Sequence, residues 1–205
     1  MPNVLFGLIK MLDKQSLIKI IQKLYEQSKV CYDELNAADG KIGDGDLGIT
    51  ILHGLEEINN NIHSFTEDMG ANFMICSKAF VKRSGSSFGT LIAFSLMNIS
   101  KELKEKSNCS HQDIQNIFKI TLKTIMERGK TKLGDKTIAD TLDLLIQKLE
   151  NNENYTETFK LATKEALQNF KGKKILIGRA RMFEDKTKDL DDPGMFALYK
   201  LSEVF

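Results

Sequence analysis

Residues 14–60 read KQSLIKIIQKLYEQSKVCYDELNAADGKIGDGDLGITILHGLEEINN, two apolar repeats separated by a glycine-rich joint. Apolar residues recur every three or four positions on both sides of the joint, at Leu17, Ile20, Ile21, Leu24, Cys31 and Leu35 and then at Ile51, Leu52, Leu55 and Ile58. This spacing is the helical period. We therefore expect one helix that begins after Asp13, a suitable N-cap, and a second helix over about residues 48–60.

The same helical period continues through the rest of the chain. Further helices are expected over about 68–82, 88–104, from Ser110, around 138–149, over 155–170, and from Asp192-Pro193-Gly194, where Asp caps and Pro starts the helix. Pro2 and Pro193 are the only prolines, so nothing between them is barred from a helix. The one β-like run, residues 175–177, is too short to build a sheet. The sequence predicts a single all-α domain over residues 1–205.

Bulk composition excludes several classes of protein. With 41% hydrophobic and 28% charged residues, the chain is expected to be globular, and a net charge of +1 favours neither nucleic acid nor a membrane as partner. No apolar run is long enough for a membrane span. Residues 1–15 lack the basic start and cleavage site of a signal peptide, and the three cysteines form no C-x-x-C pair. A cytoplasmic location with reduced thiols is expected.

The joint at residues 38–48, ADGKIGDGDLG, is the strongest candidate for a binding site. It has three carboxylates, Asp39, Asp44 and Asp46, and four glycines, and it leads into a helix. Tight curvature can direct these carboxylates to one point, where hard oxygen ligands suit magnesium or calcium. An EF-hand is excluded because Ile49 and Leu55 stand where that loop needs Gly and Glu. A solvated turn with capping aspartates remains the alternative.

Two further joints combine glycine with small hydroxyl or basic residues. Residues 84–90, SGSSFGT, open a helix whose amides could meet an anion, although an ordinary helix cap would look the same. Residues 128–137, RGKTKLGDKT, approach a Walker A loop. The inserted Asp135 and the helical segment before it exclude a P-loop, but the basic turn is still expected to face anions.

A fourth joint contains Arg179 in the sequence Gly178-Arg179-Ala180, and Asp192-Pro193-Gly194 follow it. An arginine in a glycine turn can bind phosphate oxygens through two hydrogen bonds, whereas a surface arginine is the simpler interpretation. Four such joints in one helical domain predict a nucleotide site in the loops at one end.

In this order the four joints resemble the DhaL family, the nucleotide-binding subunits of dihydroxyacetone kinases and the matching C-terminal domain of single-chain kinases. The resemblance extends from about residue 13 to 204, and its most specific parts are IGDGDLG, RGKTKLGDKT and GRA followed by DPG. It implies an antiparallel up-and-down barrel of eight helices, with ADP or ATP and two Mg²⁺ ions bound at one end.

The resemblance also implies roles for individual residues. Asp39, Asp44 and Asp46 match the family's metal ligands and, with Arg179, would serve phosphoryl transfer. The family's nucleotide contacts match Leu47, Gly48, Ile49, Thr50, Gly85, Ser86, Ser87, Gly129, Ile138, Arg179, Asp192, Pro193 and Gly194. Lys130 or Lys136 would add positive potential. The chain departs from the family at Leu47, near Thr50 and at Phe88, where many members have His, Asn and Gly.

The resemblance further implies that this chain is half of an enzyme. In the family a separate DhaK subunit binds the ketose through a histidine, and His53, His63 and His111 form no such constellation here. One branch keeps ADP as a fixed cofactor that the phosphotransferase-system protein DhaM rephosphorylates, and this is the expected function. Exchangeable ATP with a triose or tetrulose, a non-catalytic regulatory module and a fatty-acid kinase component are the alternatives. A homodimer is a further option.

Overall fold

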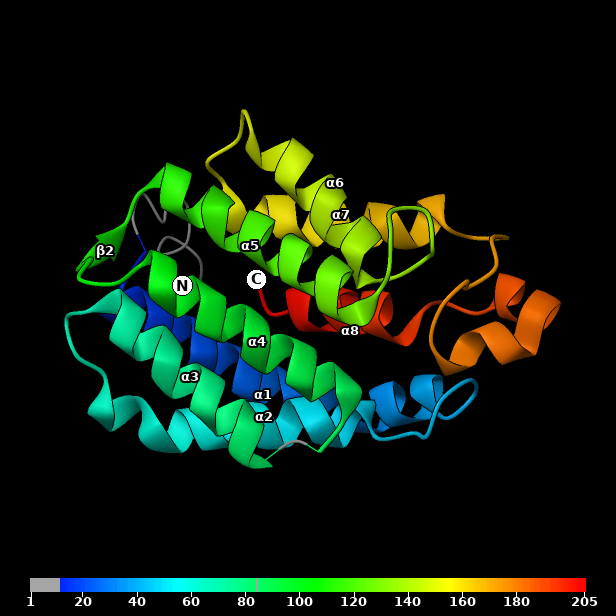
Figure 1. Cartoon of the computed structure of the whole chain (residues 1–205), viewed down its shortest axis with the longest axis horizontal. Helices are drawn as coiled ribbons and strands as arrows, with labels where there is room; N and C mark the ends of the chain where they lie inside the picture. The colour runs from blue at the N-terminus through cyan, green and yellow to red at the C-terminus, as the bar shows by residue number, and fades with distance from the viewer. Residues whose placement is uncertain (1–11, 84) are drawn as a thin grey trace, which may run out of the picture.

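The structure is a computed structural model, and it describes residues 12–83 and 85–205. Within these residues the chain forms eight α-helices: α1 (Lys14–Asp39), α2 (Leu47–Asn61), α3 (Met69–Arg83), α4 (Ser87–Glu102), α5 (His111–Gly129), α6 (Ile138–Leu149), α7 (Tyr155–Asn169) and α8 (Pro193–Ser202) (Figure 1). Each begins or ends close to the position that the apolar spacing predicts. The interpretation of the first eleven residues and the role of Ser84 lie outside the described residues.

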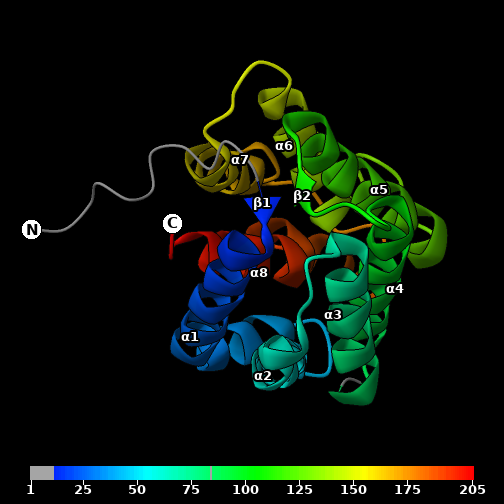
Figure 2. The same ribbon diagram turned by 90° about the vertical axis from the view of Figure 1, so that its left-hand side faces the viewer.

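The helices are arranged as a closed ring. Each helix packs against the next one in sequence, and α8 packs against α1 to complete the circle. Figure 2 shows the ring from one end, with α1, α2, α3 and α4 following one another around it. The predicted all-α fold, an eight-helix up-and-down barrel, is confirmed.

Side-chain caps define where several helices begin. Asp13 accepts a hydrogen bond from Ser16 N at 2.8 Å, and Asp192 accepts one from Met195 N at 2.9 Å with Pro193 in the first turn of α8. An N-cap of this kind stabilises a helix by about 1 kcal/mol because it pairs an otherwise free amide. Both caps were predicted from the sequence.

Two short elements were not predicted. β1 (Leu12–Asp13) and β2 (Asn108–Cys109) form a two-residue antiparallel pair, which corrects the expectation that the chain has no strand. Two residues are too few to produce an alternating pattern. Residues Arg179–Asp189 form the 3₁₀ segment η2, whereas the sequence predicted a simple turn there; a second 3₁₀ turn, η1 (Ile62–Ser64), follows α2.

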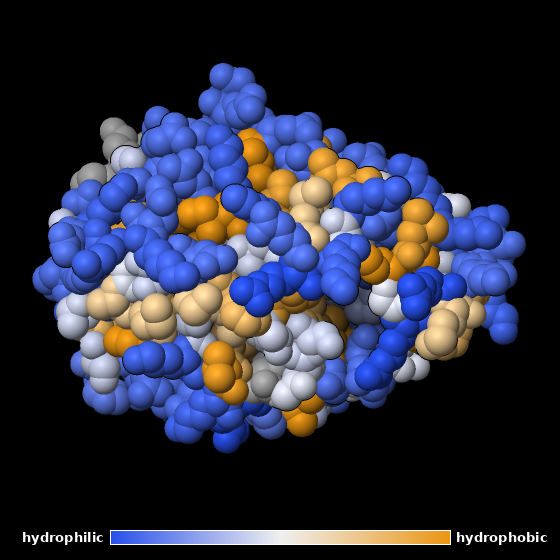
Figure 3. All heavy atoms as spheres, in the orientation of Figure 1, coloured by the Kyte–Doolittle hydropathy of each residue, from blue (hydrophilic) through white to orange (hydrophobic). Residues whose placement is uncertain are grey.

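The interior of the ring is apolar. A cavity of about 420 Å³ lies inside it, and mostly apolar side chains from all eight helices line it. On the face shown in Figure 3, hydrophilic residues predominate and apolar residues occur in short groups among them. Among the described residues, no helix combines the length and apolar character that a membrane crossing requires.

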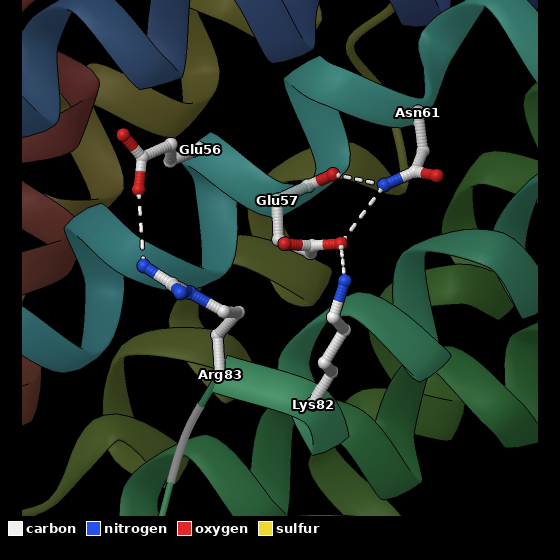
Figure 4. Close-up of polar contacts among 5 residues, drawn as sticks. All are labelled: Glu56, Glu57, Asn61, Lys82 and Arg83. Atoms are coloured by element: carbon white, nitrogen blue, oxygen red, sulfur yellow. Dashed lines mark hydrogen bonds and ion pairs between the residues drawn. The ribbon is translucent and has the colours of Figure 1, made fainter.

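Ion pairs tie the end of α3 to α2. Lys82 Nζ lies 2.7 Å from Glu57 Oε1, and Arg83 Nη2 lies 3.3 Å from Glu56 Oε2 (Figure 4). Asn61 Nδ2 donates a further hydrogen bond to Glu57 Oε1. These contacts fix the C-terminal end of α3, from which the chain continues to the Gly85-Ser86-Ser87 turn. Such exposed pairs contribute little to stability, about 0–1 kcal/mol each, so their effect is mainly on orientation.

Candidate functional site

A polar pocket of about 380 Å³ lies at one end of the ring. The α1–α2 loop and the α7–α8 segment are both found at this end, on the right in Figure 1, and the starts of α4 and α8 complete the pocket. Its lining residues are Asp39, Ile42, Gly43, Asp44, Asp46, Leu47, Gly85, Ser86, Ser87, Phe88, Ile177, Gly178, Arg179, Ala180, Pro193 and Gly194. Residues from three of the four joints recognised in the sequence, 38–48, 84–90 and 178–180 with 192–194, therefore meet in one place, whereas no residue of the 128–137 joint lines the pocket.

The α1–α2 loop directs three carboxylates at one point. Asp39, Asp44 and Asp46 each offer an oxygen, and these oxygens lie within 4.8 Å of one another. Asp39 Oδ2 also accepts hydrogen bonds from Gly45 N at 2.8 Å and Asp46 N at 3.1 Å, which close the loop. Gly45 has a φ of 74°, and a Cβ at Gly43 would lie 2.4 Å from Asp39 Oδ1. Glycine accommodates the positive φ at residue 45 and the close approach of the Asp39 carboxylate at residue 43.

The electrostatics of the loop favour a cation. Burial raises the pKa of the Asp46 carboxyl, and the nearby negative charges of Asp44 and Asp39 raise it further, while Arg179 acts in the opposite direction. A divalent cation would reverse this effect because it stabilises all three ionised groups. The all-oxygen donor set suits a hard ion such as Mg²⁺.

Arg179 brings a positive charge into direct contact with the loop. Its Nη1 lies 2.5 Å from Asp44 Oδ2, and both side chains are more than half exposed. The next residue, Ala180, packs in a small apolar cluster with Ile42 of the acidic loop and with Ile175. Residues 175–180 and the α1–α2 loop are therefore connected by an ion pair and by apolar packing.

The start of α2 uses a residue that the sequence analysis did not identify. Asn36 Oδ1 accepts hydrogen bonds from Gly48 N at 2.8 Å and Ile49 N at 3.2 Å, so these two amides already have a partner. Thr50 Oγ1 donates to Ser86 Oγ at 2.9 Å, which joins the start of α2 to the start of α4. Nothing in the local sequence distinguished Asn36 from other polar residues on α1.

The residues predicted as metal ligands or nucleotide contacts divide into two groups. Those that line the pocket are Asp39, Asp44, Asp46, Leu47, Gly85, Ser86, Ser87, Arg179, Pro193 and Gly194, whereas Gly48, Ile49, Thr50, Gly129, Ile138 and Asp192 do not line it. Ile138 lines the interior cavity and lies beside Gly194. A Cβ at Gly129 would lie 3.6 Å from Leu91 Cδ1, so this glycine sits against α4. Ile42, Phe88 and Ile177 are lining residues that the sequence analysis did not assign to the nucleotide.

Lys136 does not face the pocket, which corrects one expectation. Its side chain is 1% exposed, and its ammonium donates to the carbonyl oxygens of Lys173, Thr187 and Leu190. An ammonium has three donors, so none is left for a phosphate. Lys130, the other lysine expected to add positive potential, is exposed at the end of α5 and does not line the pocket.

Comparison with known proteins places this geometry in a family. Residues 41–205 match the DAK2 domain family. The chain belongs to this family. The ADP-binding subunit DhaL of a PEP-dependent dihydroxyacetone kinase from Listeria innocua is 26% identical, over 90% of this chain and 91% of that protein. A probable dihydroxyacetone kinase from Dictyostelium discoideum is 29% identical over 84% of this chain, but only 30% of that protein is covered.

Solved structures of family members share the fold. The dihydroxyacetone kinase of C. freundii superposes with a TM-score of 0.73 at 18% identity, and it covers 100% of this chain. Its complex with AMP-PNP and Mg²⁺ gives a TM-score of 0.72. This chain spans about a third of those structures, 36% and 35% of their length.

Proposed function

We propose that this chain is the magnesium–nucleotide-binding subunit of a dihydroxyacetone kinase. The observation that carries the proposal is the pocket in which Asp39, Asp44 and Asp46 lie beside Arg179 and the starts of α4 and α8. Carboxylates attract the metal, while an arginine and helix N-termini attract phosphate oxygens. Related proteins named as ADP-binding subunits, and one structure named as an AMP-PNP and Mg²⁺ complex, support the same assignment.

In the proposed site each side chain has a separate task. The three carboxylates would bind two Mg²⁺ ions, which supply charge neutralisation for the phosphates when bound. Arg179 would leave Asp44 and turn to the phosphates, because the metal replaces it as the counter-charge of that carboxylate. Ser86, Ser87 and Gly194 sit at helix starts, where backbone amides can donate to an anion. Phosphoryl transfer needs this positioning more than covalent help from the protein.

The acceptor would be a ketose on a second subunit. Several relatives that match most of this chain are named as DhaL subunits of PEP-dependent or PTS-dependent kinases. We therefore propose a DhaK-type partner that binds dihydroxyacetone and a DhaM-type protein that rephosphorylates bound ADP. We also propose that residues 1–205 act as one domain, in the cytoplasm, where such phosphotransferase proteins work.

A second candidate is an ATP-dependent ketose kinase with an exchangeable nucleotide. An L-erythrulose kinase from Pectobacterium atrosepticum is 26% identical over 80% of this chain, although only 30% of that protein is covered. A four-carbon ketose and ATP are therefore the alternative acceptor and donor.

Nucleotide retention tests the proposal and separates the two donors. The purified chain is dialysed extensively in Mg²⁺, denatured, and assayed for nucleotide. Retained ADP that phosphoenolpyruvate and the phosphotransferase proteins convert to ATP supports the cofactor function. An empty protein that uses added ATP with a DhaK-type partner supports the second candidate. If Asp44→Ala retains or binds as much nucleotide as the original chain, the metal assignment is wrong.

A further inference from the structure

The buried Lys136 has no role in the site described above, yet it is among the most completely enclosed side chains of the protein. It lies between α5 and α6, with a left-handed backbone (φ 61°) and 1% of its surface exposed. Burial lowers the pKa of its ammonium, and the charges of Asp191, Asp192 and Asp189 partly offset this effect. A charged group is rarely kept in such a place unless its hydrogen bonds are satisfied.

All three hydrogen bonds of Lys136 go to one segment of the chain. Its Nζ lies 2.8 Å from Lys173 O, 3.1 Å from Thr187 O and 2.6 Å from Leu190 O. Lys173 lies near the start of residues 171–192, the connection between α7 and α8 that we call the arginine segment, and Thr187 and Leu190 lie near its end. One ammonium thus connects three points of a connection that contains no α-helix.

Other contacts also define the path of the arginine segment. Gly172 N donates to Lys188 O at 3.2 Å, and Lys174 Nζ lies 2.8 Å from Asp185 Oδ1. Thr187 Oγ1 accepts from Ile175 N at 2.9 Å and donates to Glu184 O at 2.7 Å, which joins its two halves. Leu176 N donates to Asp135 O, the residue before Lys136. Most of its remaining side chains are exposed, so the contacts of the buried Lys136 and Thr187 are the ones best protected from water.

The arginine segment in turn determines where Arg179 lies. Ile175 and Ala180 pack against Ile42 of the acidic loop, and Leu190 packs against the same cluster. Arg179 is located between these two packing points and reaches Asp44. Because Lys173, Thr187 and Leu190 share one ammonium, a change at Lys136 would release both sides of the turn that contains Arg179.

We infer that Lys136 is a positioning residue for the nucleotide site: it fixes the arginine segment so that Arg179 faces the aspartate loop, and it never touches the nucleotide. The inference rests on the proposed function for its effect on affinity, but its effect on the segment itself is independent of any ligand. Preorganisation of this kind strengthens binding, because no binding free energy is then lost in ordering the segment.

The test compares four proteins in a double-mutant cycle: the original chain, Lys136→Met, Arg179→Ala and the double variant. Met keeps the length of the side chain and loses its three donors. We expect Lys136→Met and Arg179→Ala each to weaken Mg²⁺–ADP binding at least about tenfold, as loss of a charge-assisted contact does. The double variant should be no weaker than Arg179→Ala, because coupled residues are not additive. Lys132→Met, an exposed lysine of the same joint, is the matched control.

Hydrogen exchange provides a second measurement that needs no nucleotide. Peptides from residues 172–190 should exchange faster in Lys136→Met than in the original chain, while peptides from α1 to α4 stay unchanged. Thr187→Val, which removes two internal hydrogen bonds of the segment, should give the same pattern and replaces Lys136→Met if that variant does not fold.

The outcomes separate the inference from the proposed function. Unchanged exchange in residues 172–190, or an affinity loss that adds fully to that of Arg179→Ala, would overturn the positioning role. If the original chain binds no ADP, the proposed function fails, and the exchange measurement still decides whether Lys136 fixes the segment.

Discussion

The α1–α2 loop and the α5–α6 joint are both short, glycine-containing and charged, yet they use their charges in opposite ways. In the loop, Asp39, Asp44 and Asp46 lie close together at a pocket, where Arg179 pairs with Asp44 from the exposed side. In the joint, the Lys136 ammonium is enclosed by three carbonyl oxygens of the same chain. The aspartate cluster keeps negative charge that a ligand could neutralise, whereas the Lys136 ammonium already has its three hydrogen-bond donors paired by the protein.

This difference shows what separates a binding site from an internal anchor. A charged turn is a candidate binding site when its charges repel one another and remain accessible, because a ligand of opposite charge then removes the repulsion. A charged turn becomes part of the framework when the backbone supplies all of its partners, because removing the charge then leaves buried acceptors unpaired. Mutations in the two regions should therefore affect different properties.

The largest expected effect is on nucleotide binding, at Asp46. We expect Asp46→Asn to weaken Mg²⁺–ADP binding by about a hundredfold, since a metal ligand loses its charge. The stability of the ligand-free protein should not fall, because the raised pKa shows that burial and Asp44 and Asp39 disfavour this charge. Calorimetric titration and urea unfolding measure the two quantities. Asp33→Asn, which changes an exposed carboxylate of α1, is the control. A loss of stability in Asp46→Asn would mean that the Asp46 charge stabilises the ligand-free fold, which contradicts this account.

At Lys136 the expected effect is on protein stability, and it is smaller than the effect of Asp46 on nucleotide binding. Lys136→Met should lower the free energy of unfolding by about 2–3 kcal/mol, because buried carbonyls lose a charged donor. Lys132→Met should change it by less than about 0.5 kcal/mol, since that side chain is exposed. Urea unfolding at neutral pH measures both. Equal stability of the two variants would contradict the internal role of the Lys136 ammonium.

A pH effect at Asp192 is expected to be smaller again. Burial raises the pKa of this carboxyl to about 7, above its ordinary value of 3.8, while the amides of Met195 and Gly194 and the charge of Lys136 act against the shift. A carboxyl with a raised folded-state pKa contributes stability at low pH, and this contribution is lost as the pH rises to about 7. We expect Asp192→Asn, which keeps an acceptor for Met195 N, to remove a loss of about 1 kcal/mol between pH 6 and 8. Urea unfolding at several pH values measures this. If the free energy of unfolding changes with pH equally in the original chain and in Asp192→Asn, the prediction is wrong.

The smallest effect is expected at the ion pair that joins the α1–α2 loop to the arginine segment. Arg179 and Asp44 are both largely exposed, so their pair contributes little by itself. Arg179→Met should therefore change the affinity of the loop for Mn²⁺ without nucleotide by less than about fivefold. Electron paramagnetic resonance of free Mn²⁺ measures this affinity. Loss of Mn²⁺ binding in this variant would mean that Arg179 shapes the loop rather than the nucleotide site.

The sequence predicted the elements of the fold well because their causes are local. Apolar residues at helical spacing predicted most of the helices, the start of the eighth was recognised from Asp192-Pro193-Gly194, and Asp13 was recognised as a cap from its own neighbourhood. The aspartate cluster was also accessible, because glycines and carboxylates adjacent in the sequence require only one tight loop to meet.

The contacts that the sequence could not predict join distant residues. Lys136 reaches carbonyls 37, 51 and 54 residues away, and backbone acceptors have no sequence signature. Because Lys136 lies in a Walker-like pattern, the sequence suggested that it faces the phosphates, and this prediction is wrong. Asn36 was missed for a related reason: it caps α2 from the last turns of α1, and nothing nearby marks it. Ile42, in the acidic loop, packs on residues more than a hundred positions later.

The most direct test of the central claim is a calorimetric titration of ADP into the purified, nucleotide-free chain, with Mg²⁺ and then with EDTA. If Asp39, Asp44 and Asp46 bind the metal that bridges to the phosphates, ADP binds in Mg²⁺ and its affinity falls by at least about a hundredfold in EDTA. Equal affinity in the two buffers would contradict the account, because the aspartate loop would then have no part in nucleotide binding.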